Sequence, residues 1–277
     1  MPMGLLKIDE SKCKQDGLCA KDCMTAIIRI PEGGGFPYIS PDMENMCRVC
    51  GHCVAVCPHG ALSHELIPIE KSPAIKDELK ISQDQAVQFL RTRRSIRFYH
   101  DKPVEKEKIQ KLIETARYAP TGSNSQMVEW QVLTDKSVIR NLAAKTVEWL
   151  RQLLKDDPSI AKTSPYLYQV LAAWDAGYDP VLRKAPVVIV ASAPKEAMSG
   201  ATDIILALSY LELLAPTMGL GTCWAGLLNG ALLALPSLKE DMDLPENHPY
   251  HFPLMLGYPK AKYYRLPERK QPKITYR

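Results

Sequence analysis

The sequence predicts an α+β protein with a small cysteine-rich head and a larger body of mixed helices and strands. Seven of the eight cysteines lie between Cys13 and Cys57, so the head is chemically distinct from the rest of the chain. The body combines helix-like periodicity with strand-like apolar runs such as 187–192. The polar, proline-marked segment 68–81 lacks periodicity and predicts a linker. We therefore expect three parts, 1–67, 68–81 and 82–277.

Composition excludes several classes of protein. Apolar residues make up 46% and charged residues 24%, as in ordinary soluble proteins. The net charge is +4, and the basic residues form no block of the kind that binds nucleic acid. The N-terminus predicts no signal peptide, and proline and glycine interrupt the uncharged span 213–238, so we expect a cytoplasmic protein without a membrane segment. In a reducing compartment, closely spaced cysteines indicate metal binding or catalysis.

The charge is uneven along the chain. Residues 1–70 carry 6 Lys/Arg and 9 Asp/Glu, whereas the remainder carries 29 and 22. The acidic head would suit docking to a basic partner, and the alternative is an ordinary solvated surface.

The second cysteine group, CRVCGHCVAVCP, has the spacing Cys47-x2-Cys50-x2-Cys53-x3-Cys57-Pro58. This run is typical of bacterial ferredoxins, in which the first three cysteines bind one [4Fe–4S] cluster and the fourth ligates the other cluster of a pair. Zinc is the alternative, but it usually takes two separated CxxC pairs and leaves the closing Cys-Pro unexplained. The spacing therefore favours iron–sulfur chemistry.

The first group, CKQDGLCAKDC, has an aspartate where the ferredoxin spacing requires a cysteine. If Cys57 ligates a distant cluster, a first cluster must exist to receive it, and Asp16 occupies its missing position. Such a site would hold either a [4Fe–4S] cluster with one carboxylate-bound iron or, after loss of that iron, a [3Fe–4S] cluster. The remaining alternative is a loop residue beside an empty site. The predicted ligands are Cys13, Asp16, Cys19 and Cys57 for the first cluster, and Cys23, Cys47, Cys50 and Cys53 for the second.

Residues 5–67 accordingly resemble a two-cluster ferredoxin domain of the bacterial type. The resemblance implies a hairpin between the two halves at Gly33–Gly35 and a helix-to-strand exit at CPHGAL. The first half departs from the pattern at Asp16 and at Met24, which replaces the usual proline.

The body begins with a capping box, Ser82 to Gln85, which predicts a helix from about residue 83 that ends around RTRRSIRFY. A second helix is expected from Pro103. The runs 130–134 and 187–192 predict strands. The segment 204–214 predicts a helix that is apolar nearly all round, which indicates a central position or a subunit interface.

Three motifs in the body carry chemistry. RRSIR, from Arg93, offers planar arginine forks and a hydroxyl that suit a phosphate monoester. APTGSNSQ, from Ala119, is dense in small donors and acceptors. GLGTCWAG, from Gly219, packs a turn where the backbone must approach something closely. Each motif alone is also consistent with an ordinary helix end, loop or turn.

In this order and at these distances, the three motifs resemble the nitroreductase superfamily of FMN proteins over roughly residues 85–277. The resemblance implies a nitroreductase fold with a mixed central sheet, a domain-swapped homodimer and an FMN in each of two interface pockets. The arginine segment would hold the phosphate and ribityl chain, the small-residue loop would line the isoalloxazine, and the third motif would lie near the reactive nitrogen. The implied FMN contacts are Arg93, Arg94, Ser95, Arg97, Pro120, Thr121, Gly122, Asn124, Ala225, Gly226 and Arg269.

Other residues have plainer predicted roles. Because Gln126 is followed by Met-Val-Glu-Trp instead of the common Pro-Trp, we do not count it as a contact. Cys223 is expected to be a small buried apolar residue. We expect the aromatic residues in 156–180 to lie in the core instead of clamping substrate, and we assign His52, His59 and His64 surface or packing roles, with tuning of the clusters as the alternative. The aromatic residues in question are Tyr166, Tyr168, Trp174 and Tyr178.

Together these features predict an oxidoreductase in which iron–sulfur clusters relay single electrons from a low-potential donor, such as reduced ferredoxin, to FMN, which reduces a small substrate by two electrons. Nitroaromatics, quinones and enones are candidate substrates, and we assign no catalytic side chain. Alternatives are an NAD(P)H-dependent flavin reductase that sends electrons outward, a non-catalytic electron carrier or redox sensor, and a zinc-binding interaction protein.

Overall fold

Two structural units make up the chain, and the computed structural model describes residues 4–277. The first unit contains the residues up to Ile81 together with Ser123–Ser125. The second contains Ser82–Gly122 and Gln126–Arg277. Each unit has its own hydrophobic core.

The first unit consists of two small antiparallel sheets and short helices. Its elements are β1 (Leu6–Ile8), α1 (Leu18–Lys21), β2 (Ile28–Arg29), β3 (Tyr38–Ile39), η1 (Pro41–Met46), α2 (His52–Ala55), β4 (Leu62–His64), η2 (Ile69–Lys71) and η3 (Asp77–Leu79). Strand β1 pairs with β4, and β2 pairs with β3 across the expected glycine hairpin. Glycines 33–35 all have positive φ, which glycine adopts without steric cost.

The core of the first unit is small. Ile27, Val54 and Leu62 are almost completely buried, and the cysteines pack half-buried around them. So small a core leaves little apolar burial for stability, and domains of this size commonly rely on metal groups for it.

The second unit contains the remaining helices and strands. Its elements are α3 (Gln83–Thr92), α4 (Lys106–Ala116), β5 (Glu129–Leu133), α5 (Lys136–Asp156), α6 (Ile160–Thr163), α7 (Tyr166–Asp175), β6 (Val187–Ala193), α8 (Gly200–Leu214), η5 (Ala215–Met218), β7 (Gly221–Trp224), α9 (Gly226–Ala234), α10 (Ser237–Glu240) and β8 (Tyr250–Gly257). The short turn η4 (Gly122–Asn124) begins at Gly122 of this unit, and its other two residues are assigned to the first unit. Most predicted FMN contacts lie in or next to three places, namely the end of α3, the η4 turn and the start of α9, and Arg269 lies in the C-terminal segment after β8.

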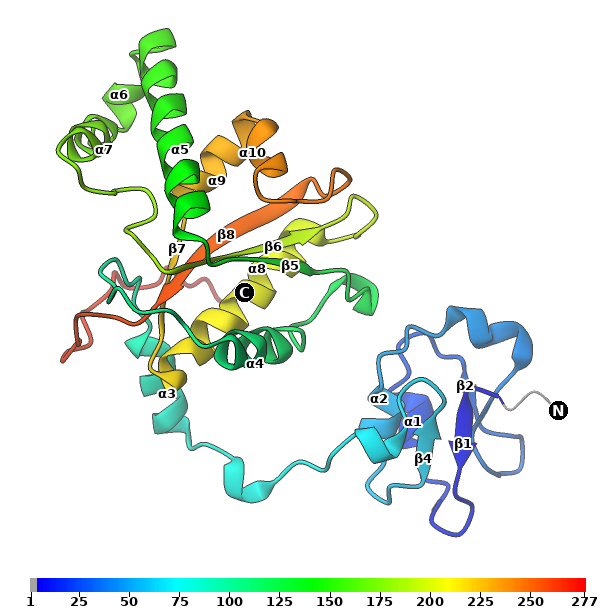
Figure 1. Ribbon diagram of the computed structural model, residues 1–277. Coiled ribbons are helices and arrows are strands. Elements are labelled where there is room, and N and C mark those ends of the chain that lie inside the picture. Colours follow the sequence, from blue (N-terminus) through cyan, green and yellow to red (C-terminus); the bar gives the residue numbers. More distant parts are fainter. Residues whose placement is uncertain (1–3) are drawn as a thin grey trace. The chain divides into compact units, whose positions relative to one another are not determined.

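A four-stranded sheet, ordered β5-β6-β8-β7, forms the middle layer of the second unit. Helices α4 and α8 cover one face, and α5 and α9 cover the other (Figure 1). Alternate residues of β6 serve the two cores, with Val188 and Val190 facing α5 and Val187 and Ile189 facing α8. All seven residues of β6 are buried, as its apolar sequence predicted.

Most predicted elements are present with shifted ends. The capping box is confirmed, because the Gln85 N–H donates to Ser82 Oγ at 3.2 Å and the Ser82 N–H donates to Gln85 Oε1 at 2.8 Å. Helix α4 starts at Lys106 and not at Pro103, because Glu105 is still extended. Helix α8 starts at Gly200, one turn before the predicted apolar run.

The sheet differs from the mixed one that we expected. All three ladders are antiparallel. Strand β6 runs opposite to β5, and β8 lies between β6 and β7 and runs opposite to both. Within residues 4–277 no parallel ladder joins this sheet.

Helix α8 is long and strongly apolar. Among residues 4–277, only α8 with its following turn, Gly200–Met218, is long and apolar enough to cross a membrane. However, Leu208 and Leu211 are fully buried in the core, and the helix packs on β6 and β8. Ile205 and Tyr210 remain exposed on its other side. The helix is therefore a core element with one open apolar face.

Candidate functional site

The eight predicted cluster ligands surround two separate cavities in the first unit. One cavity, with about 390 Å³ of empty volume, is lined by Cys13, Asp16, Cys19 and Cys57. The other, of about 410 Å³, is lined by Cys23, Cys47, Cys50 and Cys53. Each cavity thus takes one residue from the other half of the unit, which is the crossed arrangement that the spacing predicts.

The backbone explains why the two cavities are alike. Three residues with positive φ follow each other at the same spacing in both halves. They are Gln15, Gly17 and Ala26 in the first half, and Val49, Gly51 and Gly60 in the second. This repeat places Asp16 at the position that Cys50 occupies in the second half. The carboxylate therefore stands at a position for which the spacing predicts a ligand.

Asp16 has two polar neighbours of its own. Its Oδ1 accepts a hydrogen bond from the Leu18 N–H at 3.1 Å, and its Oδ2 lies 3.7 Å from His59 Nε2. One carboxylate oxygen thus anchors the loop, and the other lies toward the histidine. The side chain is 38% exposed, which makes this corner of the first cavity open to solvent.

The donor set of the cavities fits iron–sulfur clusters. Among the described residues, no three His, Cys, Asp or Glu side chains converge on one point as a single metal ion requires. Burial raises the pKa of Cys53 to about 11, so this thiol must lose a proton when it binds metal.

In the second unit, the RRSIR segment begins where α3 ends. Arg93 and Arg94 line a cavity with about 980 Å³ of empty volume, and Arg269 of the C-terminal segment 259–277 lines it too. Arg91 adds a fourth guanidinium, with Glu268 as the one acidic residue that lines this cavity. The structure therefore brings Arg93, Arg94 and Arg269 to one cavity, although Arg93 and Arg269 are 176 residues apart in the sequence. Arg97, which the resemblance also assigned to the phosphate and ribityl chain, does not line this cavity. This arrangement suits a phosphate monoester.

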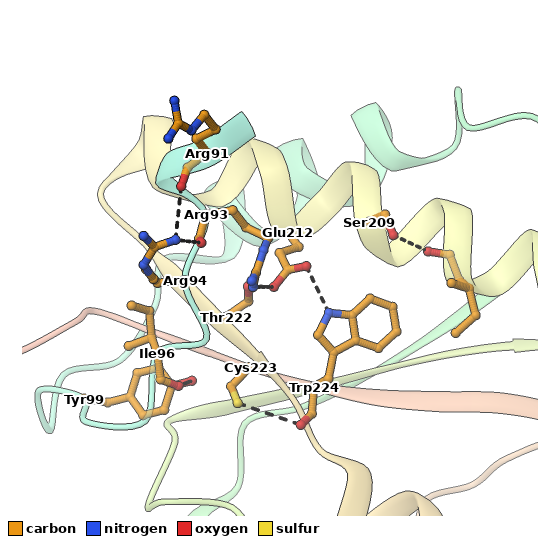
Figure 2. Close-up of polar contacts among 11 residues, drawn as sticks. Arg91, Arg93, Arg94, Ile96, Tyr99, Ser209, Glu212, Thr222, Cys223 and Trp224 are labelled. Atoms are coloured by element: carbon orange, nitrogen blue, oxygen red, sulfur yellow. Dashed lines mark hydrogen bonds and ion pairs between the residues drawn. The ribbon is translucent and has the colours of Figure 1, made fainter. Parts of the chain in front are cut away.

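A buried carboxylate orients one of these arginines (Figure 2). Glu212, on α8 and only 6% exposed, accepts a hydrogen bond from Arg93 Nη1 at 3.1 Å and from Trp224 Nε1 at 2.9 Å. Thr222 Oγ1 lies 3.4 Å from the same carboxylate. Sequence reasoning missed Glu212, and the only signal for it was a single charge inside an apolar helix.

Ser95 and Arg97 follow in an extended segment that runs beside β7. The Ile96 N–H donates to the Thr222 carbonyl at 2.7 Å, and Ile96 is buried against Gly221. A Cβ at Gly221 would lie 2.3 Å from Ile96, so the close approach requires glycine there. Arg97 is exposed, and Ser95 is half-buried.

The small-residue loop is held by α8. The Gly122 N–H donates to Asp203 Oδ1 at 3.0 Å, while the other oxygen of this buried carboxylate has no partner among the described residues. Thr121 Oγ1 accepts from the Gln126 N–H at 3.1 Å. Pro120 is exposed, and Asn124 ends the η4 turn with a φ of 54°. Asp203 is a second buried acid that the sequence reasoning missed.

The third motif ends at the start of α9, where the backbone of Gly226 borders open space. The Ala225 N–H donates to the Pro253 carbonyl at 3.0 Å, and Ala225 caps α9. Nothing lies within 4 Å of the position where a side chain on Gly226 would stand. A planar ring therefore has room to approach this backbone. The site residues themselves remain predictions.

Two plainer expectations have different outcomes. Cys223 is 5% exposed and packs in the core, as expected. The core assignment is wrong for Tyr166, Tyr168 and Tyr178, which are 53%, 52% and 71% exposed, because they project from α7 and the loop after it. Trp174 is half-buried against the core, as expected.

Comparison with protein families identifies both units. Residues 90–258 match the model of the nitroreductase family, and residues 41–63 match that of a 4Fe–4S binding domain. The second match covers the all-cysteine run and does not reach the segment that contains Asp16.

The chain resembles curated sequences and solved structures of this family. A protein of Archaeoglobus fulgidus named "Putative NADH dehydrogenase/NAD(P)H nitroreductase" is 28% identical over 196 residues, which is 70% of this chain and 98% of that protein. The NAD(P)H-dependent FMN reductase of Bacillus subtilis is 26% identical over 193 residues, 67% of this chain and 71% of its own. An FMN-bound nitroreductase structure from Bacteroides fragilis has a TM-score of 0.57 at 20% identity, covering 69% of this chain and 98% of its own. An FMN-bound nitroreductase structure from Desulfitobacterium hafniense has a TM-score of 0.56 at 19% identity, and the match covers 70% of this chain and 99% of that one.

Proposed function

Because this chain belongs to the nitroreductase family and carries a 4Fe–4S binding domain, it is an FMN-dependent oxidoreductase with an iron–sulfur head, and we propose that the head feeds electrons to the flavin. In this proposal, a low-potential protein such as reduced ferredoxin supplies single electrons to two clusters. The final acceptor is a small molecule of the nitroaromatic, quinone or enone class. The observation that carries the proposal is the pair of crossed ligand sets around two cavities.

Cofactors supply the redox chemistry here, because clusters exchange one electron at a time and FMN can collect two and deliver them together. The residues of the chain bind and orient. In the proposed site, Arg93, Arg94 and Arg269 hold the phosphate with charge-assisted hydrogen bonds. Glu212 keeps Arg93 in place, and the open backbone at Gly226 leaves space for the ring.

A homodimer would complete this site. The exposed apolar residues Ile205 and Tyr210 on α8 offer a surface for a second copy. The C-terminal segment 259–277 is exposed and has no regular structure of its own, yet it carries the large apolar residues Tyr263, Tyr264 and Ile274. Light scattering on the purified protein tests this, and a monomer at micromolar concentration would contradict it.

A specific observation favours a second candidate, an NAD(P)H-dependent reductase that sends electrons outward through the clusters. The names of both curated relatives contain NADH or NAD(P)H. The two candidates differ in which donor reduces the flavin.

Anaerobic spectroscopy separates them. Protein purified without oxygen is mixed with NADH, NADPH or reduced ferredoxin in a stopped-flow cell, and flavin bleaching at 450 nm is followed. The proposal predicts rapid bleaching with reduced ferredoxin, and much slower bleaching with either nucleotide. EPR before and after dithionite then counts the centres, and a single centre would contradict the two-cluster head.

A further inference from the structure

His64 is the only histidine of the first unit that is fully buried among the described residues. It ends β4 and lies opposite Leu6 of β1, and it is 2% exposed. Its ring lines the second cavity together with Cys47. Of the surface or packing roles expected from the sequence, burial excludes the surface one for His64, and the alternative of cluster tuning stays open.

Its hydrogen bonds determine which ring nitrogen carries the proton. The Leu66 N–H donates to His64 Nδ1 at 3.1 Å, so Nδ1 presents its lone pair. The proton of the neutral ring must then lie on Nε2. His64 Nε2 is 3.5 Å from Cys47 Sγ, so the N–H donates to the sulfur.

The local backbone holds the ring in this orientation. A tight turn follows β4, in which the Ile67 N–H donates to the His64 carbonyl at 3.0 Å and the His64 N–H donates to the Ile67 carbonyl at 3.4 Å. The second hydrogen bond to the same sulfur comes from the Val49 N–H at 3.4 Å. The Cys47 sulfur thus accepts one backbone and one side-chain donor.

The internal repeat shows that this donor is specific to one half. Cys13 corresponds to Cys47, and at the same offset Ile30 corresponds to His64. Ile30 lines the first cavity as His64 lines the second. An isoleucine cannot donate a hydrogen bond, so the two cavities differ at this position in polarity.

We propose that His64 is a positioning residue that donates its Nε2–H to Cys47 Sγ and thereby raises the reduction potential of the second cluster. The inference rests on the proposed function, since it needs the second cluster to be present. Reduction adds one electron, supplied by the low-potential donor, and one negative charge that spreads onto the thiolates. A hydrogen bond to a cluster sulfur stabilises that charge, and no proton has to move.

A redox titration followed by EPR tests the inference on the full chain. His64→Ile copies the corresponding residue of the first half. It is expected to lower the equilibrium constant for reduction of the second cluster about tenfold, or about 59 mV for one electron. His64→Gln retains an amide donor and should remain within about threefold of the wild type. His52→Gln is the matched control, because His52 lines the same cavity but bonds to Asp22 at 3.1 Å, and it should leave both potentials unchanged.

The variants are compared at equal iron content. If His64→Ile and the wild type titrate at the same potential, the inference is overturned, while the two-cluster head stands. Wild-type protein without iron and acid-labile sulfide would overturn the proposed function, and the inference with it.

A measurement on the unaltered protein covers the case in which His64→Ile does not fold. Protein with ¹⁵N-labelled histidine is reduced and studied by pulsed EPR. A histidine ¹⁵N coupling to the reduced cluster, retained in His52→Gln and lost in His64→Gln, supports the hydrogen bond. Absence of any histidine coupling in the wild type overturns it.

Discussion

Arg93 and Glu212 form an ion pair at 3.1 Å that joins the end of α3 to the last turn of α8. The Glu212 side chain is buried and the Arg93 side chain is 30% exposed, so the acid lies in the core and the base reaches the cavity. This pairing fixes an arginine that would otherwise be mobile, and it leaves the remaining guanidinium donors available to an anion.

Removal of Glu212 should therefore destabilise the second unit. Glu212→Ala leaves Arg93 without its partner and the Trp224 N–H without an acceptor, and we expect a loss of about 3 kcal/mol in the free energy of unfolding. Urea unfolding followed by tryptophan fluorescence measures it, since all four tryptophans lie in residues 82–277. Glu114→Ala, at an exposed position, is the control and should change stability by less than about 0.5 kcal/mol. Equal effects of the two substitutions would contradict the prediction.

Arg269 should contribute to binding of the FMN phosphate. Loss of a charge-assisted hydrogen bond costs roughly 1.5–3 kcal/mol, so Arg269→Ala is expected to weaken FMN binding by about one to two orders of magnitude. Titration of the apoprotein by flavin fluorescence measures this. Riboflavin, which lacks the phosphate, should bind the variant and the wild type equally. Arg265→Ala, in the same segment but away from the cavity lining, is the matched control. An equal loss for riboflavin would show that the effect does not come from the phosphate.

Asp16 should determine the composition of the first cluster. Because Asp16 occupies the position of Cys50, Asp16→Cys supplies a fourth thiolate and should give two stable [4Fe–4S] centres. Asp16→Ala should accumulate a [3Fe–4S] centre, seen by EPR in protein oxidised in air. Asp22→Ala, a nearby acid that does not line the first cavity, should match the wild type. If Asp16→Cys and Asp16→Ala have the same iron content and spectrum, Asp16 is not a ligand.

His251 should make the stability of the second unit depend on pH. It lies buried on β8 with no partner for either ring nitrogen among the described residues, and burial, aided by the charge of Lys239, lowers its pKa to about 4. Between about pH 6.5 and 4, His251 is protonated in the unfolded chain but stays neutral in the folded chain. Stability therefore falls as the pH falls through this window, by on the order of 2 kcal/mol from this group.

Urea unfolding at pH 5 and pH 7 checks this. His251→Leu removes the titrating group and should reduce the difference in unfolding free energy between the two pH values. His100→Leu, at an exposed position, should not. A pH difference that is the same in His251→Leu and the wild type would contradict the assignment.

Local patterns predicted much of this structure, whereas partners distant in sequence were missed. The cysteine spacing, the glycine hairpin and the Ser82 capping box involve residues close in sequence, and their periodicity or spacing is visible directly. The acids Glu212 and Asp203 could not be assigned, because their partners lie 119 and 81 residues away. The sequence left surface and packing roles open for His64 for the same reason, since its burial depends on how β4 pairs with β1.

The exposed tyrosines of α7 show that composition alone can also predict burial wrongly. Their apolar character predicts burial, but their helix covers the edge of the core with one face only. Aromatic content alone does not tell which face of a helix meets the core.

The crossed ligand sets have a further consequence for assembly. Each cavity takes one predicted cysteine ligand from the opposite half, Cys57 in the first and Cys23 in the second, so neither half of the head alone supplies a complete predicted cluster site. A chain cut between the halves, or one that has emerged only as far as the glycine hairpin, lacks a ligand for both. If these ligand sets hold two clusters, as we propose, insertion of iron and sulfide is coupled to folding of the whole head, and an intermediate with one folded half cannot bind a cluster with its full set of ligands.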